Sequence, residues 1–227
     1  MVDAAAPEPE RNDAERGSAM SDSIAVTADN RAHYLVRPLR RSDRRLIEEA
    51  LRLLSARTLY ARFHTRGTRL SSRELDYLVD TDDRDHVSWL VLDPSQRPDG
   101  LPIALGRYVR DPEAPSRAEV ALTVCDHHQG RGVSKVLLGA LAASAQGAGV
   151  KHFCGSLLAE NHAMRSLMQN LGATLRVQEG TIWAEASADP WRLPDNGTVR
   201  RIRRVATQVD EGLSAQRRSA SSVIMRS

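Results

Sequence analysis

The order and spacing of its apolar segments predict that this chain forms a mixed α+β domain. We expect a mostly antiparallel sheet of six to seven strands with helices on both faces. Three strand-like segments between residues 86 and 124 are joined by short loops, which is typical of antiparallel neighbours. Residues 118–157 then run strand, helix, strand, and such a crossover joins parallel strands. These two observations together predict the fold class.

One strand and two helices are expected before the central strands. Residues 33–39 (HYLVRPL) have the composition of an opening strand. Apolar residues recur at helical spacing between 46 and 54 and again between 70 and 80. The second of these helices has a serine N-cap at Ser71 or Ser72.

The remaining elements alternate between the two kinds of apolar pattern. The period-two or continuous apolar runs predict strands at 86–93, 102–110, 117–124, 150–158, 173–178 and 181–186. The helical runs predict one helix from Val133 to about Gly149 and another at 160–172, each ending at a glycine. The last two strands form a closing hairpin.

The chain divides into three parts. Residues 1–30 are rich in acidic residues, alanine and proline, and we expect them to be disordered. Residues 31–190 hold the folded domain, and residues 191–227 form a basic helix and a tail that we expect to be disordered after Gln216. Apolar residues at helical spacing after Val199 indicate a helix that rests on the domain, although its arginines could also attract acidic partners or nucleic acid.

Composition excludes several classes of protein. The net charge of +3 is too small to argue for nucleic acid, which we do not expect as a partner. No apolar run reaches the roughly 20 residues of a membrane span. The N-terminus does not resemble a signal peptide, and Cys125 and Cys154 are expected to be reduced thiols, so we expect a cytosolic protein. No group of side chains has metal-ligand spacing, and we expect no metal.

The turn at residues 126–138 (DHHQGRGVSKVLL) is a candidate anion site. Gly130 and Gly132 stand where the helix begins, and its first amides have no intrahelical acceptor. Arg131 could add a charged hydrogen bond. The spacing is neither that of a P-loop nor that of a dinucleotide-binding turn, which has a third glycine where this chain has Lys135. The residues alone leave open a phosphate site or an ordinary tight connection.

The wider stretch VALTVCDHHQGRGVSKVLL resembles the coenzyme-A-binding motif of the GNAT superfamily of N-acetyltransferases, Q/R-x-x-G-x-G/A. Gln129 and Gly132 match that motif, and Ser134 replaces its last small residue. The resemblance extends over roughly residues 33–187, with Asn161 at the place of a family asparagine. The segments LSARTLYARF and AENHAMRSLMQNLG are most similar to the bacterial protein lysine acetyltransferases.

The resemblance implies a GNAT fold with the parallel crossover at the CoA site, and acetyl-CoA as co-substrate. In the family, the strand before the turn splays, and its amides bind acetyl-CoA. By position these amides belong to Leu122, Thr123 and Val124. The residues implied for the pyrophosphate are Gln129, Gly130, Arg131, Gly132, Val133 and Ser134. Asn161 would bind the pantetheine arm, and it also suits the N-cap of its own helix.

Glu119 is the candidate catalytic residue. At neutral pH only about one lysine amine in a thousand is uncharged, so acetyl transfer needs a base. Alternation places Glu119 on one face of its strand with Ala121 and Thr123. Glu119 could instead simply pair with Arg107 or Arg117. The resemblance implies that it deprotonates lysine through a water molecule.

We assign no catalytic role to three other features of the sequence. Met168 stands where many family members carry a proton-donating tyrosine, so a general acid is not evident. Cys125 has no paired base for an acyl-cysteine route. His127 and His128 are expected in a solvated loop.

We therefore predict an acetyl-CoA-dependent N-acetyltransferase that acts on protein lysines. A small amine as acceptor is an alternative, as is a catalytically weak CoA-binding regulatory module.

Overall fold

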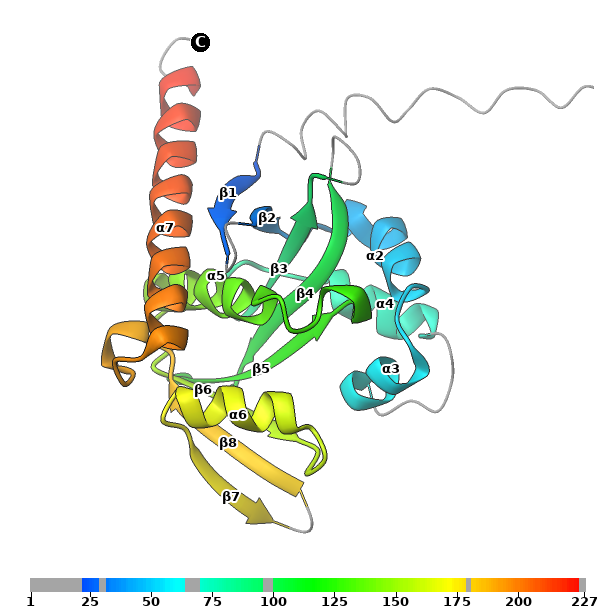
Figure 1. Cartoon of the computed structure of the whole chain (residues 1–227). Helices are drawn as coiled ribbons and strands as arrows, with labels where there is room; N and C mark the ends of the chain where they lie inside the picture. Colours follow the sequence, from blue (N-terminus) through cyan, green and yellow to red (C-terminus); the bar gives the residue numbers. More distant parts are fainter. Residues whose placement is uncertain (1–21, 29–31, 64–69, 96–99, 179–180, 225–227) are drawn as a thin grey trace, which may run out of the picture.

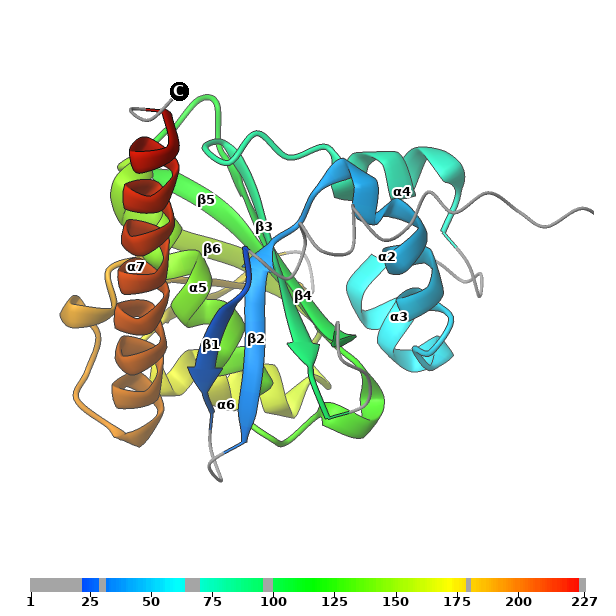
Figure 2. The same ribbon diagram turned by 90° about the horizontal axis from the view of Figure 1, so that it is seen from above.

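The computed structural model describes residues 22–28, 32–63, 70–95, 100–178 and 181–224. Their fold is an eight-stranded sheet between two layers of helices (Figures 1 and 2). The mixed α+β class predicted from the sequence is confirmed. The sheet has one strand more than the upper end of our estimate.

The strands follow the order β1-β2-β3-β4-β5-β6-β8-β7 across the sheet. Their bounds are β1 (Ile24–Thr27), β2 (His33–Pro38), β3 (His86–Asp93), β4 (Leu101–Arg110), β5 (Arg117–Val124), β6 (His152–Leu157), β7 (Thr174–Gln178) and β8 (Thr181–Ser187). Only β5 and β6 pair in parallel, and the other pairs are antiparallel. The predicted crossover is therefore present, with α5 (Val133–Ala148) as its helix.

The helices separate onto the two faces of the sheet. The first face carries α2 (Arg44–Leu51), α3 (Ala56–Phe63) and α4 (Ser72–Val79). The second face carries α5 (Val133–Ala148), α6 (His162–Asn170) and α7 (Gly197–Ile224). Short 3-10 turns lie at Arg41–Asp43, Asp126–His128 and Pro190–Arg192. Ser71, one of the two serines predicted as N-cap, caps α4 and accepts a hydrogen bond from the Glu74 amide.

The crossing of α5 and α7 forms the centre of the second face. Leu137 and Leu141 of α5 are completely buried, as is Val209 of α7. The two helices approach closely at Gly139, where an added Cβ would lie 2.7 Å from the Cβ of Val205. The C-terminal helix is thus part of the core. It runs to Ile224, beyond Gln216, where we had expected disorder; each added helical residue gains a backbone hydrogen bond.

The strand β1 corrects the expectation that residues 1–30 are disordered. Ile24 and Val26 are buried, because β1 pairs with β2 and packs against α7. At Gly212 of α7 an added Cβ would lie 2.7 Å from Ile24, so only a residue without a side chain fits there. Burial of two aliphatic side chains explains why this short segment is ordered. Residues 1–21 lie outside the described part of the chain.

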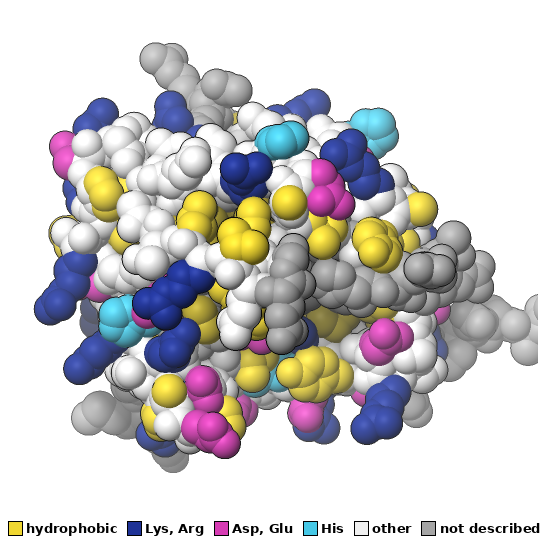
Figure 3. Space-filling view, turned by 90° about the horizontal axis from the view of Figure 1, so that it is seen from below, with side chains coloured by type: hydrophobic (Ala, Val, Ile, Leu, Met, Phe, Trp, Pro, Cys, Tyr) yellow, Lys and Arg dark blue, Asp and Glu magenta, His cyan; other side chains and the backbone are white. Residues whose placement is uncertain are grey.

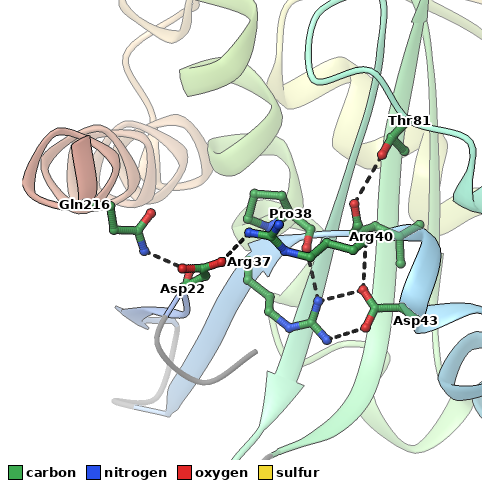
Figure 4. Close-up of polar contacts among 8 residues, drawn as sticks. Asp22, Arg37, Pro38, Arg40, Asp43, Thr81 and Gln216 are labelled. Atoms are coloured by element: carbon green, nitrogen blue, oxygen red, sulfur yellow. Dashed lines mark hydrogen bonds and ion pairs between the residues drawn. The ribbon is translucent and has the colours of Figure 1, made fainter. Parts of the chain in front are cut away.

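A buried ion pair joins β2 to the first helical face (Figure 4). Both terminal nitrogens of Arg37 donate to the carboxylate of Asp43, at 2.7 and 2.8 Å. Asp43 also accepts a hydrogen bond from the Arg40 amide at 2.8 Å, and Arg37 donates to the carbonyl of Pro38. Because both charged side chains are almost fully buried, each depends on the other for its charge compensation.

Candidate functional site

Strands β5 and β6 separate halfway along β5. Their parallel pairing covers Arg117 to Glu119 on β5 and ends at the pair Glu119–Cys154. Strand β5 continues to Val124 while pairing only with β4 on its other side. Among the described strands, none therefore pairs with the β6-facing edge of β5 from Val120 to Val124. Leu122, Thr123 and Val124, the residues implied for acetyl-CoA binding, all lie on this open edge.

The glycine turn joins the open edge of β5 to helix α5. Gly130 and Gly132 have φ angles of +73° and +85°, which glycine adopts readily. An added Cβ at Gly130 would meet nothing within 4 Å. Helix α5 starts at Val133 and has no side-chain cap. Its first amides and its positive dipole end are thus available to an anion.

Hydrogen bonds from α3 hold the turn in place. The carboxylate of Asp126 accepts bonds from the Ser55 amide and hydroxyl at 2.9 and 2.7 Å, and from the Thr58 hydroxyl at 2.8 Å. Burial opposes ionisation, but these bonds outweigh it and lower the pKa of Asp126. The Gln129 side chain donates to the Val124 carbonyl at 3.1 Å. This brace could not be predicted from the sequence, because its partners are 68 to 71 residues apart.

A cleft of about 470 Å³ lies between the open edge, the turn and the start of α6. It is lined by nine of the ten residues that the resemblance implied for the cofactor. These are Leu122, Thr123, Val124, Gln129, Gly130, Gly132, Val133, Ser134 and Asn161. Arg131 does not line the cleft and is exposed on the turn. Sequence reasoning missed the wall on the other side, which includes Tyr60 of α3 and Leu167 of α6.

Asn161 is the N-cap of α6, as predicted. Its side-chain oxygen accepts a hydrogen bond from the Met164 amide at 3.1 Å. Because an amide side chain carries separate donor and acceptor groups, the cap leaves the nitrogen of Asn161 available to a ligand in the cleft.

Glu119 lies on the first face of the sheet, beside a second cavity of about 500 Å³. Arg117, one of the two partners considered for Glu119, forms an ion pair with Glu185 at 2.8 Å. The charge of Glu119 acts on Arg107 of β4, the other partner considered. Its guanidinium stacks 4.8 Å from the ring centroid of Tyr77, and burial lowers its pKa. Glu119 is exposed and can reach solvent.

The exposed indole of Trp183 on β8 lines the same cavity as Glu119. Figure 3 shows hydrophobic side chains gathered across the lower side of the molecule, where β7, β8 and α6 lie. Val177 of β7 is among the most exposed apolar residues, at 76%. Sequence analysis identified this hairpin but gave none of its side chains a role. The signal in the sequence that could have indicated such a role is a tryptophan on the exposed face of an edge hairpin.

The structure also gives the surroundings of Met168, Cys125 and His128. Met168 lines the cavity beside Glu119 and cannot donate a proton. Burial raises the pKa of the Cys125 thiol to about 11, with Asp126 adding to the shift, so this thiol is a poor nucleophile at neutral pH. His128 is buried, contrary to our expectation of a solvated loop, because it faces inward from the 3-10 turn; burial lowers its pKa.

The described residues contain neither a metal-binding cluster nor a membrane-spanning helix. No group of three or more His, Cys, Asp or Glu side chains in the described segments could hold a metal ion. Of the helices described, none has the length and apolar character needed to cross a bilayer.

Comparison with known proteins gives a match to a family model and to several relatives. The model of the acetyltransferase (GNAT) domain matches residues 33–174. Acetyltransferase Pat of Mycolicibacterium smegmatis is 39% identical over 138 residues, which make up 60% of this chain and 40% of that protein. Acetyltransferase PA5475 of Pseudomonas aeruginosa is 31% identical over 153 residues, 66% of this chain and 80% of that protein. This chain thus spans about two fifths of the length of the mycobacterial relative.

Solved structures show the same fold. The GNAT domain of S. lividans PAT superposes with a TM-score of 0.66 at 27% identity, covering 74% of this chain and 97% of that domain. A cAMP-binding acyltransferase from Mycobacterium smegmatis has a TM-score of 0.53 at 29% identity, covering 91% of this chain and 62% of that one. A Salmonella typhimurium structure described with its cofactor acetyl-CoA shares the fold at 17% identity, with a TM-score of 0.52. The GNAT fold expected from the turn motif is confirmed.

Proposed function

Since this chain belongs to the acetyltransferase (GNAT) family, whose co-substrate is acetyl-CoA, we propose that it transfers acetyl groups to lysine side chains of proteins. One observation carries the proposal: Glu119 lies where β5 and β6 separate, beside the open edge on which a thioester would be held. The likeness to Acetyltransferase Pat favours a protein lysine as acceptor over a small amine.

In this proposal the cleft holds the CoA moiety. The pyrophosphate accepts hydrogen bonds from the backbone between Gln129 and Ser134, at the positive end of α5. Arg131, exposed on the turn, adds charge from outside the cleft. The pantetheine arm pairs with the open edge of β5 and with the side-chain nitrogen of Asn161.

The chemistry requires a base and an oxyanion site. Glu119 takes a proton from the lysine ammonium through a water molecule, and the neutral amine attacks the thioester carbon. A backbone amide on the open edge, between Leu122 and Val124, stabilises the negative oxygen of the tetrahedral intermediate. The carbon–sulfur bond then breaks, the new amide nitrogen releases its remaining extra proton to water, and the thiolate takes a proton from water, since Met168 offers none. A thiol with a pKa near 8.5 leaves without a dedicated acid.

Glu119→Gln tests the role of the base. We expect kcat/KM for acetyl transfer to fall about 10² to 10⁴-fold, because a positioned general base typically accelerates a reaction by that factor. The Kd for CoA should be unchanged. Glu113→Gln is the matched control, since Glu113 is an exposed glutamate in the loop before β5. Equal rates for wild type and Glu119→Gln would rule out this base.

The acceptor is identified by incubating a bacterial lysate with the protein and isotope-labelled acetyl-CoA. Label on lysine side chains in digested proteins, absent with Glu119→Gln, supports the proposal. Label confined to small amines supports the alternative acceptor. Binding of CoA with no labelled product at all indicates a regulatory module.

A further inference from the structure

The cavity beside Glu119 does not end at the sheet. It passes through the gap between β5 and β6 and continues on the second face, under helices α5, α6 and α7. It meets the CoA cleft along Leu122, Leu158, Glu160, Asn161 and Met164, which line both spaces. A group attached to CoA could therefore extend from the cleft into this inner space.

The inner space is apolar. On the second face it is lined by Leu138, Ala142, Phe153, Met168, Leu171 and Ile202. We call this part of the cavity the inner chamber. Helix α6 contributes an apolar stripe to it, yet no residue of α6 is buried. Leu167 and Met168 of α6 pack against a small apolar cluster that includes Leu138 and Ile202, but they stay partly exposed and do not fill the space beside it.

An acetyl group is far smaller than this space. The whole cavity has a volume of about 500 Å³, within the range of pockets that hold entire small molecules. The inner chamber lies behind the sheet from a protein acceptor that approaches Glu119 on the first face, whereas it borders the CoA cleft directly. A group attached to CoA therefore has the shorter path into it.

We propose that this protein accepts acyl groups of medium length, about four to eight carbons, whose tails lie in the inner chamber. The proposal rests on the proposed function and extends its donor class. The chemistry is that of acetyl transfer: the amine nitrogen forms an amide bond with the acyl carbon, the carbon–sulfur bond breaks, Glu119 receives the amine proton and CoA leaves as a thiolate.

The test compares acetyl-, butyryl-, hexanoyl- and octanoyl-CoA with one lysine peptide as acceptor. Free CoA release gives kcat/KM, and calorimetry gives the Kd of each donor. We expect affinity and kcat/KM to rise about fourfold for each methylene buried, the equivalent of about 0.8 kcal/mol, until the chamber is full. A fall of tenfold or more in both quantities from acetyl- to hexanoyl-CoA would overturn the proposal.

Ala142→Leu locates the effect, since Ala142 lies on the α5 wall of the inner chamber. We expect the ratio of hexanoyl to acetyl kcat/KM to fall at least tenfold. Gln146→Leu adds the same side chain to an exposed position of α5 and should leave the ratio unchanged. If Ala142→Leu does not fold, Met168→Trp fills the chamber from α6 instead. An unchanged ratio in the folded variant that fills the chamber contradicts the proposal.

The binding data separate the two proposals. Tighter binding of hexanoyl-CoA without transfer to any lysine supports the inner chamber and contradicts the proposed function. Acetyl transfer with no gain in hexanoyl-CoA binding supports the proposed function and contradicts the inner chamber.

Discussion

Strand β3 is covered by helices on both faces, whereas β7 at the far edge of the same sheet is exposed along most of its length. The helices differ in the same way. Ten of the 16 residues of α5 are buried, but none of the nine in α6. One half of the molecule, from β1 to β5, is packed as a core. The other half, from β6 to β8 with α6, encloses a cavity.

The difference indicates how the two halves divide their tasks. A close-packed core resists changes of volume, and its stability comes from aliphatic burial. The half around the cavity buries less apolar surface and leaves a space that a ligand can occupy. We therefore expect substitutions of buried core residues in the first half to change stability, and substitutions of residues that line the cavity or the CoA cleft to change activity. Four predictions test this division.

The largest effect on stability is expected for Asp43→Ala in the packed half. The change leaves the buried Arg37 guanidinium without its counter-charge, which typically costs about 3–5 kcal/mol. Urea denaturation measures the loss. Arg40→Ala is the control, since it removes the partly exposed ion pair with Asp22 seen in the same view and should cost at most about 1 kcal/mol. Equal losses for the two variants would contradict the prediction.

Two truncations compare the halves directly. Leu141→Ala removes a fully buried side chain between the sheet and α7 and should lower the free energy of unfolding by about 2–5 kcal/mol. Met168→Ala removes a partly exposed side chain that already borders the cavity, so its loss should be about 1 kcal/mol. Thermal unfolding with and without CoA measures both. A larger loss for Met168→Ala would show that α6 is packed more tightly than described.

Two glycines of α5 form a matched pair of smaller effect. Gly139→Ala places a methyl group 2.7 Å from Val205 and 2.9 Å from the Ile202 carbonyl, so we expect a loss of about 1–3 kcal/mol. Gly147→Ala meets nothing within 4 Å on an exposed helical position, and alanine is the better helix former. We expect a gain of about 0.5–1 kcal/mol in chemical denaturation. The same sign for both would contradict the close contact of α5 and α7.

The sequence predicted the packed half better than the half around the cavity. Strands β3 to β5 and helix α5 follow from local apolar patterns, and the glycine turn follows from its motif. The strand β1 was missed because its order depends on α7, nearly 200 residues away, where Gly212 makes room for Ile24. A local composition rule cannot detect such a contact.

The site was predictable wherever backbone geometry determines it. The turn and the open edge of β5 depend on a strand, two glycines and a helix start. Each of these can be recognised from a short stretch of sequence. The brace from Asp126 to Ser55 and Thr58 depends on tertiary folding, as does the inner chamber. A cavity arises where apolar side chains from several elements do not fill the space between them. It therefore cannot be predicted from any single segment of the sequence.

The smallest functional effect is expected at the two cysteines, which lie in different halves. Cys125 packs with the core of the first face, and Cys154 lines the cavity. With the pKa of Cys125 raised from 9.0 to about 11, its thiolate fraction at pH 8 is about one in a thousand. We therefore expect iodoacetamide to modify it about a hundredfold more slowly than an ordinary thiol of the same reference pKa, and more slowly than Cys154.

Peptide mapping after timed alkylation gives both rates. Cys125→Ala should change kcat/KM by less than about twofold, because a protonated thiol takes no part in acyl transfer. Since the raised pKa favours the folded state only while the thiol is neutral, this contribution to stability is present below pH 9 and lost as the pH rises through 11. Rapid alkylation of Cys125 at pH 8, blocked by acetyl-CoA, would place that thiol in the cleft and revive the acyl-cysteine route.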